Sequence, residues 1–239
     1  MVLIESGLEV DIGNIPKDIF TLMINLGYSD AILEIINPEN LSEYFSRIQS
    51  QTSYFSNKFT LHLRKTLNDK GEKTLNKKVL DYWRFNCHFL VHECSSAEIT
   101  KWAAQDQRLD ALRFPPLYIH QLFDLSTARI MAENKKCLEI TMKNFILSPT
   151  NQIKIFRNLL HVIKRAMNKE VPILFNSQIE TIYDVVSPKS LIGLSAFLDL
   201  NPDFIFNFSQ IHLKKILEKN ISRLQSNYVA PGIKSLDDS

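Results

Sequence analysis

Two histidines and a glutamate on one predicted strand are the first groups whose types and spacing could do chemistry. His88 and His92 lie four residues apart and so share one face of the strand, with Glu93 on the other face. A hydrolytic metal centre needs such ligands to converge with at least one more histidine or aspartate. None of the six histidines belongs to an H-x-H or H-E-x-x-H pattern. We therefore expect packed or surface histidines, no metal-binding residues and no self-sufficient active site.

A polar strand end is the second candidate. The segment VPILFNSQIETIYDVVSPKSLIGL, residues 171–194, predicts a buried strand that ends in Asn176, Ser177 and Gln178, then a loop and a helix that begins near Lys189. In α/β proteins, ligands bind at the carboxyl ends of strands and beside helix N-termini. Ser177 lacks the G-x-S-x-G pattern of a nucleophile. It could bind a phosphate or simply cap a helix. We expect this strand end to hold another group in place rather than to carry out a reaction.

A stripe of basic side chains marks a helix predicted over residues 153–168. Its apolar positions follow the i, i+3, i+4, i+7 pattern of a buried face; they are Phe156, Leu159, Leu160, Ile163 and Met167. A second stripe contains no acidic residue and consists of Lys154, Arg157, His161, Lys164 and Arg165. A solvated face and a phosphate-binding face both fit this second stripe. Phosphate binding by distributed cations releases counterions, which would make it sensitive to salt.

Further basic residues fall near this helix if the strands form a barrel. The net charge is only +2, from 28 basic and 26 acidic residues, so a basic surface must come from local distribution. The third predicted strand carries Arg64 and Lys65, and Arg113 could point into a strand-end crevice. The residues that we expect to contact an anionic macromolecule are Arg113, Lys143, Arg157, Lys164, Arg165, Ser177, Lys189, Lys214 and Lys215.

Alternating strands and helices must position these groups. The predicted strands cover residues 7–12, 30–36, 58–67, 88–93, 109–114, 137–142, 171–176 and 203–208. The predicted helices cover residues 17–26, 41–49, 75–85, 97–107, 122–134, 153–168, 189–198 and 210–224. Strands that are apolar on both faces and alternate with helices indicate a parallel sheet. About eight such units favour a TIM-like α/β barrel, and a doubly wound open sheet is the alternative. We assign residues 1–226 to a single barrel domain and residues 227–239 to a flexible polar tail.

The composition narrows the class of protein. Of the 239 residues, 45% are hydrophobic and 23% are charged, which is typical of a globular protein. Three cysteines without a C-x-x-C pattern are interpreted as reduced core thiols of a cytoplasmic protein; they are Cys87, Cys94 and Cys137. The start, MVLIESGLEVDIG, has neither a basic region nor a long apolar run, so we expect no signal peptide. The sequence contains no run of about 18 apolar residues that would predict a membrane span.

Taken in order, several segments resemble the ribonuclease P protein component 3 family, the barrel-like subunit of archaeal and eukaryotic ribonuclease P. LEVDI is similar to that family's first strand, and HFLVHEC followed by SSAEITKWAAQDQRLDALRFPP is similar to its succession of strand, helix and strand. CLEITMKNFIL resembles its Phe-Glu-Ile strand with the loop that follows, and the basic helix and residues 171–200 come next. The resemblance covers residues 8–217 and rests on order and spacing more than on one motif.

Some positions depart from the family pattern. Asn176 stands where the family often has the first serine of a pair, and Ser177 keeps the second. Lys143 replaces a common arginine, which exchanges a bidentate fork for a point charge. The basic family positions that the chain keeps are Arg157, Lys164 and Lys189. The family's barrel is akin to metal-dependent phosphoesterase barrels that begin with an H-x-H strand. Here that strand reads EVDIG, so the resemblance implies a barrel without the metal chemistry.

The resemblance implies a subunit of ribonuclease P, the endoribonuclease that removes the 5′ leader from precursor tRNA. In that family the RNA makes the cut with bound Mg²⁺, so this chain itself would be non-catalytic and would bind no cofactor. Its lysines and arginines would contact phosphates and recognise RNA shape. The resemblance also implies pairing with a second, small ribonuclease P protein. Two alternatives stay open: a metal-dependent barrel hydrolase or phosphoesterase with a degenerate site at His88, His92 and Glu93, and a barrel scaffold that binds only protein.

Overall fold

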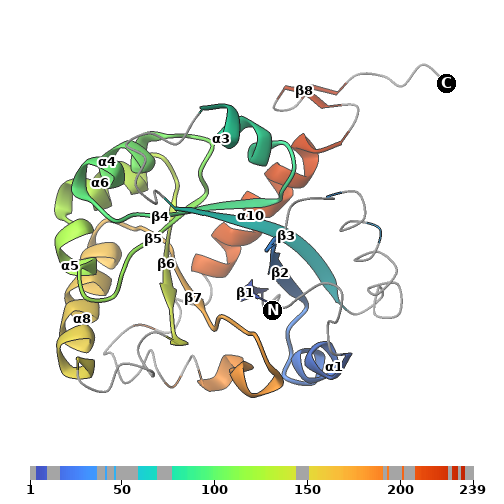
Figure 1. The fold of residues 1–239 in the computed structure, drawn as a ribbon, viewed down its shortest axis with the longest axis horizontal. Helices are drawn as coiled ribbons and strands as arrows, with labels where there is room; N and C mark the ends of the chain where they lie inside the picture. Colours follow the sequence, from blue (N-terminus) through green and yellow to red (C-terminus); the bar gives the residue numbers. More distant parts are fainter. Residues whose placement is uncertain are drawn as a thin grey trace.

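A seven-stranded parallel sheet organises the chain (Figure 1). The computed structural model describes residues 4–9, 17–36, 41, 46, 59–68, 77–143, 151–190, 193, 201, 208–225, 228–230 and 233–234. The strands are β1 (Ile4–Leu8), β2 (Asp30–Glu34), β3 (Thr60–Asn68), β4 (Phe89–Glu93), β5 (Ala111–Arg113), β6 (Cys137–Thr141) and β7 (Ile173–Asn176). They pair in chain order, each parallel to the next.

The first and last of these strands meet and nearly close a barrel. Just beyond β7, Ile179 forms an isolated parallel bridge with Leu8 of β1. The amide of Glu9 donates to the Ile179 carbonyl at 2.7 Å, and the Ile179 amide donates to the Gly7 carbonyl at 2.8 Å. The predicted TIM-like α/β barrel is therefore confirmed, because an open sheet would leave β1 and β7 at opposite edges. The strand that begins this barrel starts at Ile4, three residues before the predicted start.

Helices follow most of the strands, as expected. They are α1 (Lys17–Asn25), α3 (Lys77–Arg84), α4 (Ala97–Gln105), α5 (Ile119–Leu122), α6 (Leu125–Glu133), α8 (Gln152–Asn168), the 3-10 helix η3 (Ile182–Asp184) and α10 (Ser209–Arg223). Side-chain caps fix where two of them begin. Ser96 accepts a hydrogen bond from the Ile99 amide at 3.3 Å before α4, and Asp124 accepts one from the Thr127 amide at 2.7 Å before α6. The helices predicted at 41–49 and 189–198 and the strand predicted at 203–208 lie largely outside the described residues.

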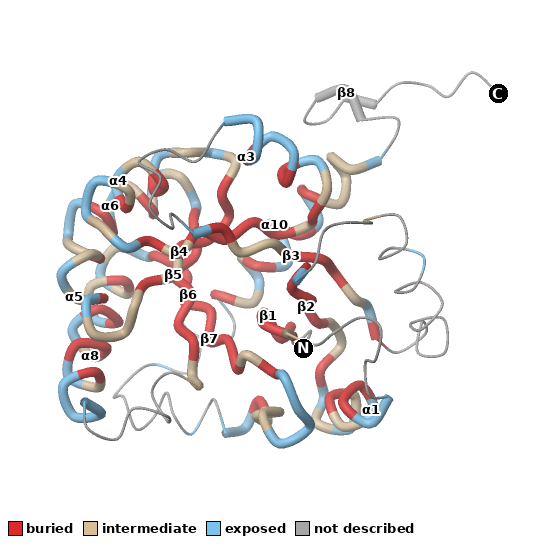
Figure 2. The backbone as a smooth tube through the Cα atoms, viewed as in Figure 1, coloured by how far each residue is buried: buried red, intermediate tan, exposed pale blue. Residues whose placement is uncertain are grey.

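The buried apolar side chains form two layers, one outside the barrel of strands and one inside it. The larger layer lies between the strands and the outer helices and includes Leu90 of β4 and Leu159 of α8. The smaller layer includes Phe89 of β4 and packs against Leu213 and Leu217 of α10. Since this second layer draws on six of the seven strands and on no outer helix but α10, it fills the barrel interior. Figure 2 shows that burial is concentrated in the strands at the centre of the molecule.

Helix α10 covers the end of the barrel at which the strands begin. Ser209 Oγ accepts the first amide of β7 at 2.9 Å, and Gln210 Oε1 accepts the first amide of β1 at 3.0 Å. Asn220 Nδ2 donates to the carbonyl that precedes β4 at 2.8 Å and to Asp110 Oδ2 at 3.1 Å. Arg84 donates to both Asp110 oxygens at 2.9 Å and to Asn220 Oδ1 at 3.0 Å. This buried polar network fixes the helix across the strand starts.

Other described features bear on the remaining predictions. The three cysteines are free and buried, as expected of core thiols. None of the helices in the described part of the chain is long and apolar enough to cross a membrane. Within the predicted tail, β8 (Tyr228–Ala230) and β9 (Ile233–Lys234) form an antiparallel hairpin. The flexibility of residues 227–239 stays a prediction.

Candidate functional site

A buried arginine crosses the barrel interior above the apolar layer. Arg64 of β3 is 0% exposed and donates from Nε to Glu34 Oε2 on neighbouring β2 at 3.0 Å. It also forms a bidentate pair with Glu139 of β6, at 2.9 and 3.0 Å. Because β3 and β6 are not neighbours in the sheet, this side chain spans the inside of the barrel. A buried charge is tolerated when it is paired and hydrogen-bonded, and Arg64 meets both conditions.

Glu139 binds a second arginine. Arg113, the last residue of β5, donates from Nη2 to Glu139 Oε1 at 2.8 Å, and the same nitrogen lies 3.8 Å from Glu9 Oε1. Burial by itself would raise the pKa of Glu139, but the charges of Arg64 and Arg113 lower it to about 2. Arg113 is therefore an internal ion-pair partner rather than a surface cation.

The polar end of β7 ties this strand to others. Asn176 donates from Nδ2 to Glu139 Oε1. Ser177 donates its amide to Glu5 Oε1 at 3.1 Å and its hydroxyl to Glu5 Oε2 at 2.9 Å. Gln178 donates to the carboxylate that follows β1 at 3.0 Å. All three side chains thus have partners inside the protein, and Ser177 is buried, so the strand end holds the barrel together.

Glu5 is a buried carboxyl at the seam between β1 and β7. Its Oε1 accepts the amides of Gly7 and Ser177, both at 3.1 Å, and its Oε2 faces the hydroxyls of Ser177 at 2.9 Å and Tyr28 at 3.5 Å. The Tyr28 hydroxyl itself donates to the Val186 carbonyl at 2.8 Å, so its oxygen can accept a hydrogen bond from a protonated Glu5. Burial raises the pKa of Glu5 to about 7, although these hydrogen bonds act to lower it. No lysine, arginine or histidine in the described part of the chain pairs with this carboxyl.

The candidate metal ligands pack against other groups. His88 Nδ1 accepts a backbone amide of β3 at 2.9 Å, and burial lowers the pKa of His88 to about 4. The ring of His92 packs edge-on against Trp102, with centroids 5.9 Å apart. Among the residues that the structure describes, no group of three or more His, Cys, Asp or Glu side chains is placed to hold a metal ion. These contacts give no support to a hydrolase built on His88, His92 and Glu93.

The outer face of α8 carries the basic stripe expected from the sequence. Its exposed members are Lys154, Arg157, His161 and Lys164. No ion pair among the described residues involves these four side chains. Arg165 differs, because its Nη1 donates to the His120 carbonyl at 3.2 Å and to the Phe123 carbonyl, which fastens α8 to α5. The opposite face is buried at Leu159 and Ile163, whereas Phe156, Leu160 and Met167 are only partly buried.

The remaining candidate cations lie elsewhere on the molecule. Lys143, after β6, pairs with Glu180 at 2.9 Å, and Lys189 is exposed beyond η3. On α10, Lys214 lies 3.9 Å from the carboxylate one turn later, and Lys215 is exposed. Of the candidate cations, Arg157 and Lys164 thus lie together on the exposed face of α8, and Lys214 and Lys215 lie on α10.

The interior role of Arg64 and its carboxylate partners was not predicted from the sequence. A signal was available, because Arg64 stands at the centre of LHLRKTL, a predicted strand with three leucines. Glu139 stands in the same way at the centre of CLEIT. Charged residues at the centre of buried strands are found inside a protein only when they are paired. Two such residues of opposite sign on different strands indicate an internal ion pair.

Comparison with known proteins places the chain beside a ribonuclease P subunit. No family model matches it. A curated protein of Methanosarcina mazei, ribonuclease P protein component 3, is 26% identical over 149 residues, which are 62% of this chain. The chain is similar to a ribonuclease P protein. The family resemblance seen in the sequence is thus confirmed, although the match spans only 61% of that relative's own length.

Solved structures support the fold along nearly the whole chain. One chain of a cryo-EM structure of archaeal ribonuclease P with mature tRNA superposes with a TM-score of 0.83, at 16% identity, over 99% of both chains. A crystal structure of an uncharacterized protein superposes with a TM-score of 0.53, at 8% identity, over 98% of this chain and 77% of the other. At such identities these likenesses concern the barrel architecture alone.

Proposed function

We propose that this chain is a protein subunit of ribonuclease P that supports the catalytic RNA in removing the 5′ leader of precursor tRNA. Its part would be to bind RNA phosphates through the basic face of α8, with Lys143, Lys189 and the lysines of α10 as further contacts. The endonucleolytic hydrolysis itself would belong to the RNA and its Mg²⁺, and this chain would bind no cofactor. Pairing with a second, small ribonuclease P protein belongs to the same proposal.

The observation that carries the proposal is the exposed basic face of α8, in a chain whose curated relative is a ribonuclease P protein. Four basic side chains repeat along about three turns of one rigid helix, at intervals of three and four residues. Distributed cations on a convex helix suit a folded RNA, whose phosphates are recognised by position rather than by base sequence. Among the described residues of the barrel interior, Arg64, Arg113 and the carboxylates of Glu34 and Glu139 bind one another, so we expect the RNA to bind on the outside.

The proposed compartment is the cytoplasm. Support comes from the three free, buried cysteines, since thiols of this kind persist where reducing systems prevent disulfide formation.

The experiment is reconstitution with the ribonuclease P RNA of the same organism. Cleavage of a precursor tRNA would be followed at low Mg²⁺, with and without this chain and its candidate small partner. We expect stimulation that requires the RNA and that declines steeply with salt. Cleavage by the protein alone would contradict the proposal, and so would the absence of any stimulation.

A double substitution tests the basic face directly. Arg157→Ala with Lys164→Ala is expected to reduce the slope of log affinity against log salt by about two, one for each phosphate that the variant no longer neutralises. The matched control is Lys77→Ala with Lys101→Ala, which also removes two exposed cations, from α3 and α4. Equal effects of the two pairs would mean that the face of α8 is merely solvated.

A further inference from the structure

A cavity of about 660 Å³ lies at the end of the barrel where β5, β6 and β7 begin. Its walls are the segments that lead into these three strands, the end of α3 and one side of α10. In TIM-like barrels the functional site is normally at the opposite end, where the strands finish. In this chain Arg64, Arg113 and Glu139 form ion pairs inside the barrel, above its apolar layer. The cavity at the strand starts is therefore separate from the strand ends and from the face of α8, and it shares with the proposed function only the lysines of α10.

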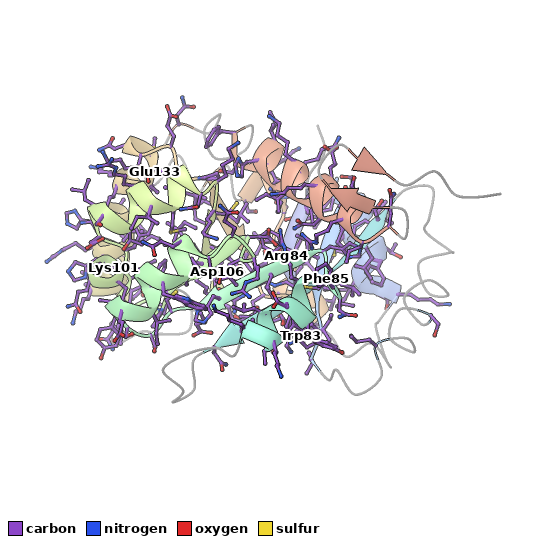
Figure 3. The ribbon with its side chains drawn as sticks, turned by 90° about the horizontal axis from the view of Figure 1, so that it is seen from above. Trp83, Arg84, Phe85, Lys101, Asp106 and Glu133 are labelled. Carbon is purple, nitrogen blue, oxygen red and sulfur yellow. The ribbon has the colours of Figure 1, made fainter. Side chains whose placement is uncertain are left out.

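Hydrogen bonds hold the cavity walls in place. Lys135 and Glu170 both adopt left-handed backbone conformations, each with φ of 55°, in the turns that end α6 and α8. His212 Nε2 lies 3.0 Å from the Lys135 carbonyl and so joins α10 to the first of these turns. Arg84 is fixed by Asp110 and by Asn220 of α10. In Figure 3, Arg84 lies near the centre of the molecule and Glu133, another lining residue, lies nearer its edge.

The charges around the cavity favour an anion. Three exposed lysines line it, namely Lys135, Lys215 and Lys219. Of the lining carboxylates, Asp110 is neutralised by Arg84 at 2.9 Å and Glu133 pairs with Arg129 at 2.9 Å. Only Glu170 then opposes the lysines among the described lining residues. A cluster of lysines with this balance attracts phosphate groups.

An aromatic pair borders the same cavity. Phe208 is 37% exposed at the start of α10, and its ring centroid lies 6.2 Å from that of His212, one helical turn later, at an interplanar angle of 35°. Both residues line the cavity. Aromatic rings among distributed cations are the combination that binds single-stranded nucleic acid, because bases stack on the rings while phosphates meet the cations. The volume falls within the range of ligand sites for small molecules.

We propose that this cavity binds an unstacked nucleotide of single-stranded RNA, with the base against Phe208 and His212 and the flanking phosphates at Lys135, Lys215 and Lys219. The proposal rests on the proposed function for its ligand, RNA, but uses another face than α8. The face of α8 meets the phosphates of a folded RNA, whereas the cavity accepts a base that has left its stack. Single-stranded loops and bulges of RNA expose such bases.

The test uses the full chain and a fluorescein-labelled hexauridylate, without any ribonuclease P RNA. Binding would be measured by fluorescence anisotropy at several salt concentrations. Phe208→Ala is expected to weaken binding roughly 5-fold to 100-fold, as removal of one ring that stacks on a base does. Lys215→Ala with Lys219→Ala is expected to reduce the salt slope by about 1.4, which corresponds to two phosphate contacts with a single strand. Phe208→Trp keeps an aromatic ring at this position and should bind hexauridylate about as tightly as the parent.

Matched controls separate this site from general effects. Phe85→Ala removes a more exposed aromatic ring, 63% exposed, from the turn after α3, and should leave binding unchanged. Lys77→Ala with Lys101→Ala, two exposed cations of α3 and α4 that neither proposal uses, should also leave it unchanged. Circular dichroism and the melting temperature of each variant would establish that it folds.

Three results would overturn the proposal: no binding of hexauridylate, equal loss for Phe85→Ala and Phe208→Ala, or equal affinity for an abasic oligonucleotide. The last would leave a phosphate site without base stacking. The two proposals fail separately. Failure of the α8 variant pair to affect reconstituted cleavage would contradict the proposed RNA surface while leaving binding at the cavity as measured.

Discussion

Replacement of Glu5 by glutamine should make the protein less sensitive to pH. Burial raises the pKa of Glu5 to about 7 in the folded protein, against 4.5 for an ordinary glutamate. The folded state therefore prefers the protonated carboxyl and holds a proton that the unfolded chain releases between these two values. The stability that this proton confers is present in full below pH 4.5 and is lost as the pH rises through 7.

The magnitude follows from the two pKa values. With 7 for the folded and 4.5 for the unfolded state, the contribution of Glu5 to the free energy of unfolding decreases by about 2.5 kcal/mol between pH 5 and pH 8. Glutamine should fit the site, because its oxygen can accept the two amides at Oε1 and its NH₂ can face the two hydroxyls at Oε2. The variant cannot ionise, so it should lose this pH dependence and gain stability relative to the parent at pH 8.

Urea unfolding of both proteins at pH 5, 6, 7 and 8, followed by circular dichroism, would measure the difference. The quantity of interest is the free energy of unfolding of Glu5→Gln minus that of the parent at each pH. Glu98→Gln, at an exposed position in the first turn of α4, controls for the loss of a carboxylate as such. A difference that stays constant within about 0.5 kcal/mol from pH 5 to pH 8 would refute the assignment of Glu5 as a protonated seam residue.

Three further substitutions test the barrel. Glu139→Gln should destabilise by about 3 to 5 kcal/mol in urea unfolding at pH 7, since it leaves the buried guanidinium of Arg64 underpaired; a loss under 1 kcal/mol would contradict the pairing. Asn220→Leu should cost about 2 kcal/mol with an unchanged m-value, because it removes hydrogen bonds to groups that stay buried; an unaltered midpoint would show that α10 docks by its apolar face alone. Gly7→Ala should cost about 1 to 3 kcal/mol, because a Cβ there would lie 1.6 Å from Asn176 Oδ1. Asn176→Ala combined with it should cost less than the two changes added, and simple additivity in thermal melts would speak against that clash.

The order of strands and helices could be predicted because buried positions carry apolar residues, which recur with the period of a strand or a helix. The apolar repeat of α8 gave its bounds to within one residue at each end, since both stripes of that helix are long and uninterrupted. The prediction placed the first strand too late because the second residue of β1 is Glu5, and a carboxylate in a strand is ordinarily interpreted as a surface residue. The number of repeating units favoured a barrel over an open sheet. Periodicity alone does not show whether the first and last strands pair with each other.

The candidate site was harder to predict, because its contacts join residues that are distant in sequence. Arg64 and Glu139 are 75 positions apart, and Arg113 and Glu139 are 26 apart. Sequence gives the sign of each charge but not which strands face one another across a barrel. Arg113 was therefore predicted to contact phosphate, although it is paired inside. The exposed stripe of α8 was predictable because it depends only on spacing within one helix.

The large separation in sequence between β1 and β7 determines when the barrel can close during synthesis. Ser177 follows Glu5 by 172 residues, so at roughly 5 to 20 residues per second the ribosome needs about 10 to 35 s after making β1 before its closing partner exists. Throughout that time β1 has one edge without a neighbour, and Glu5 has no Ser177 to bind. A circular permutant that begins at β2 and joins residue 239 to residue 1 would make β1 after β7 instead. In such a chain β1 would meet β7 sooner, but its pairing with β2 would become the long-range step, so the last closure would move from the β1–β7 seam to the β1–β2 pair.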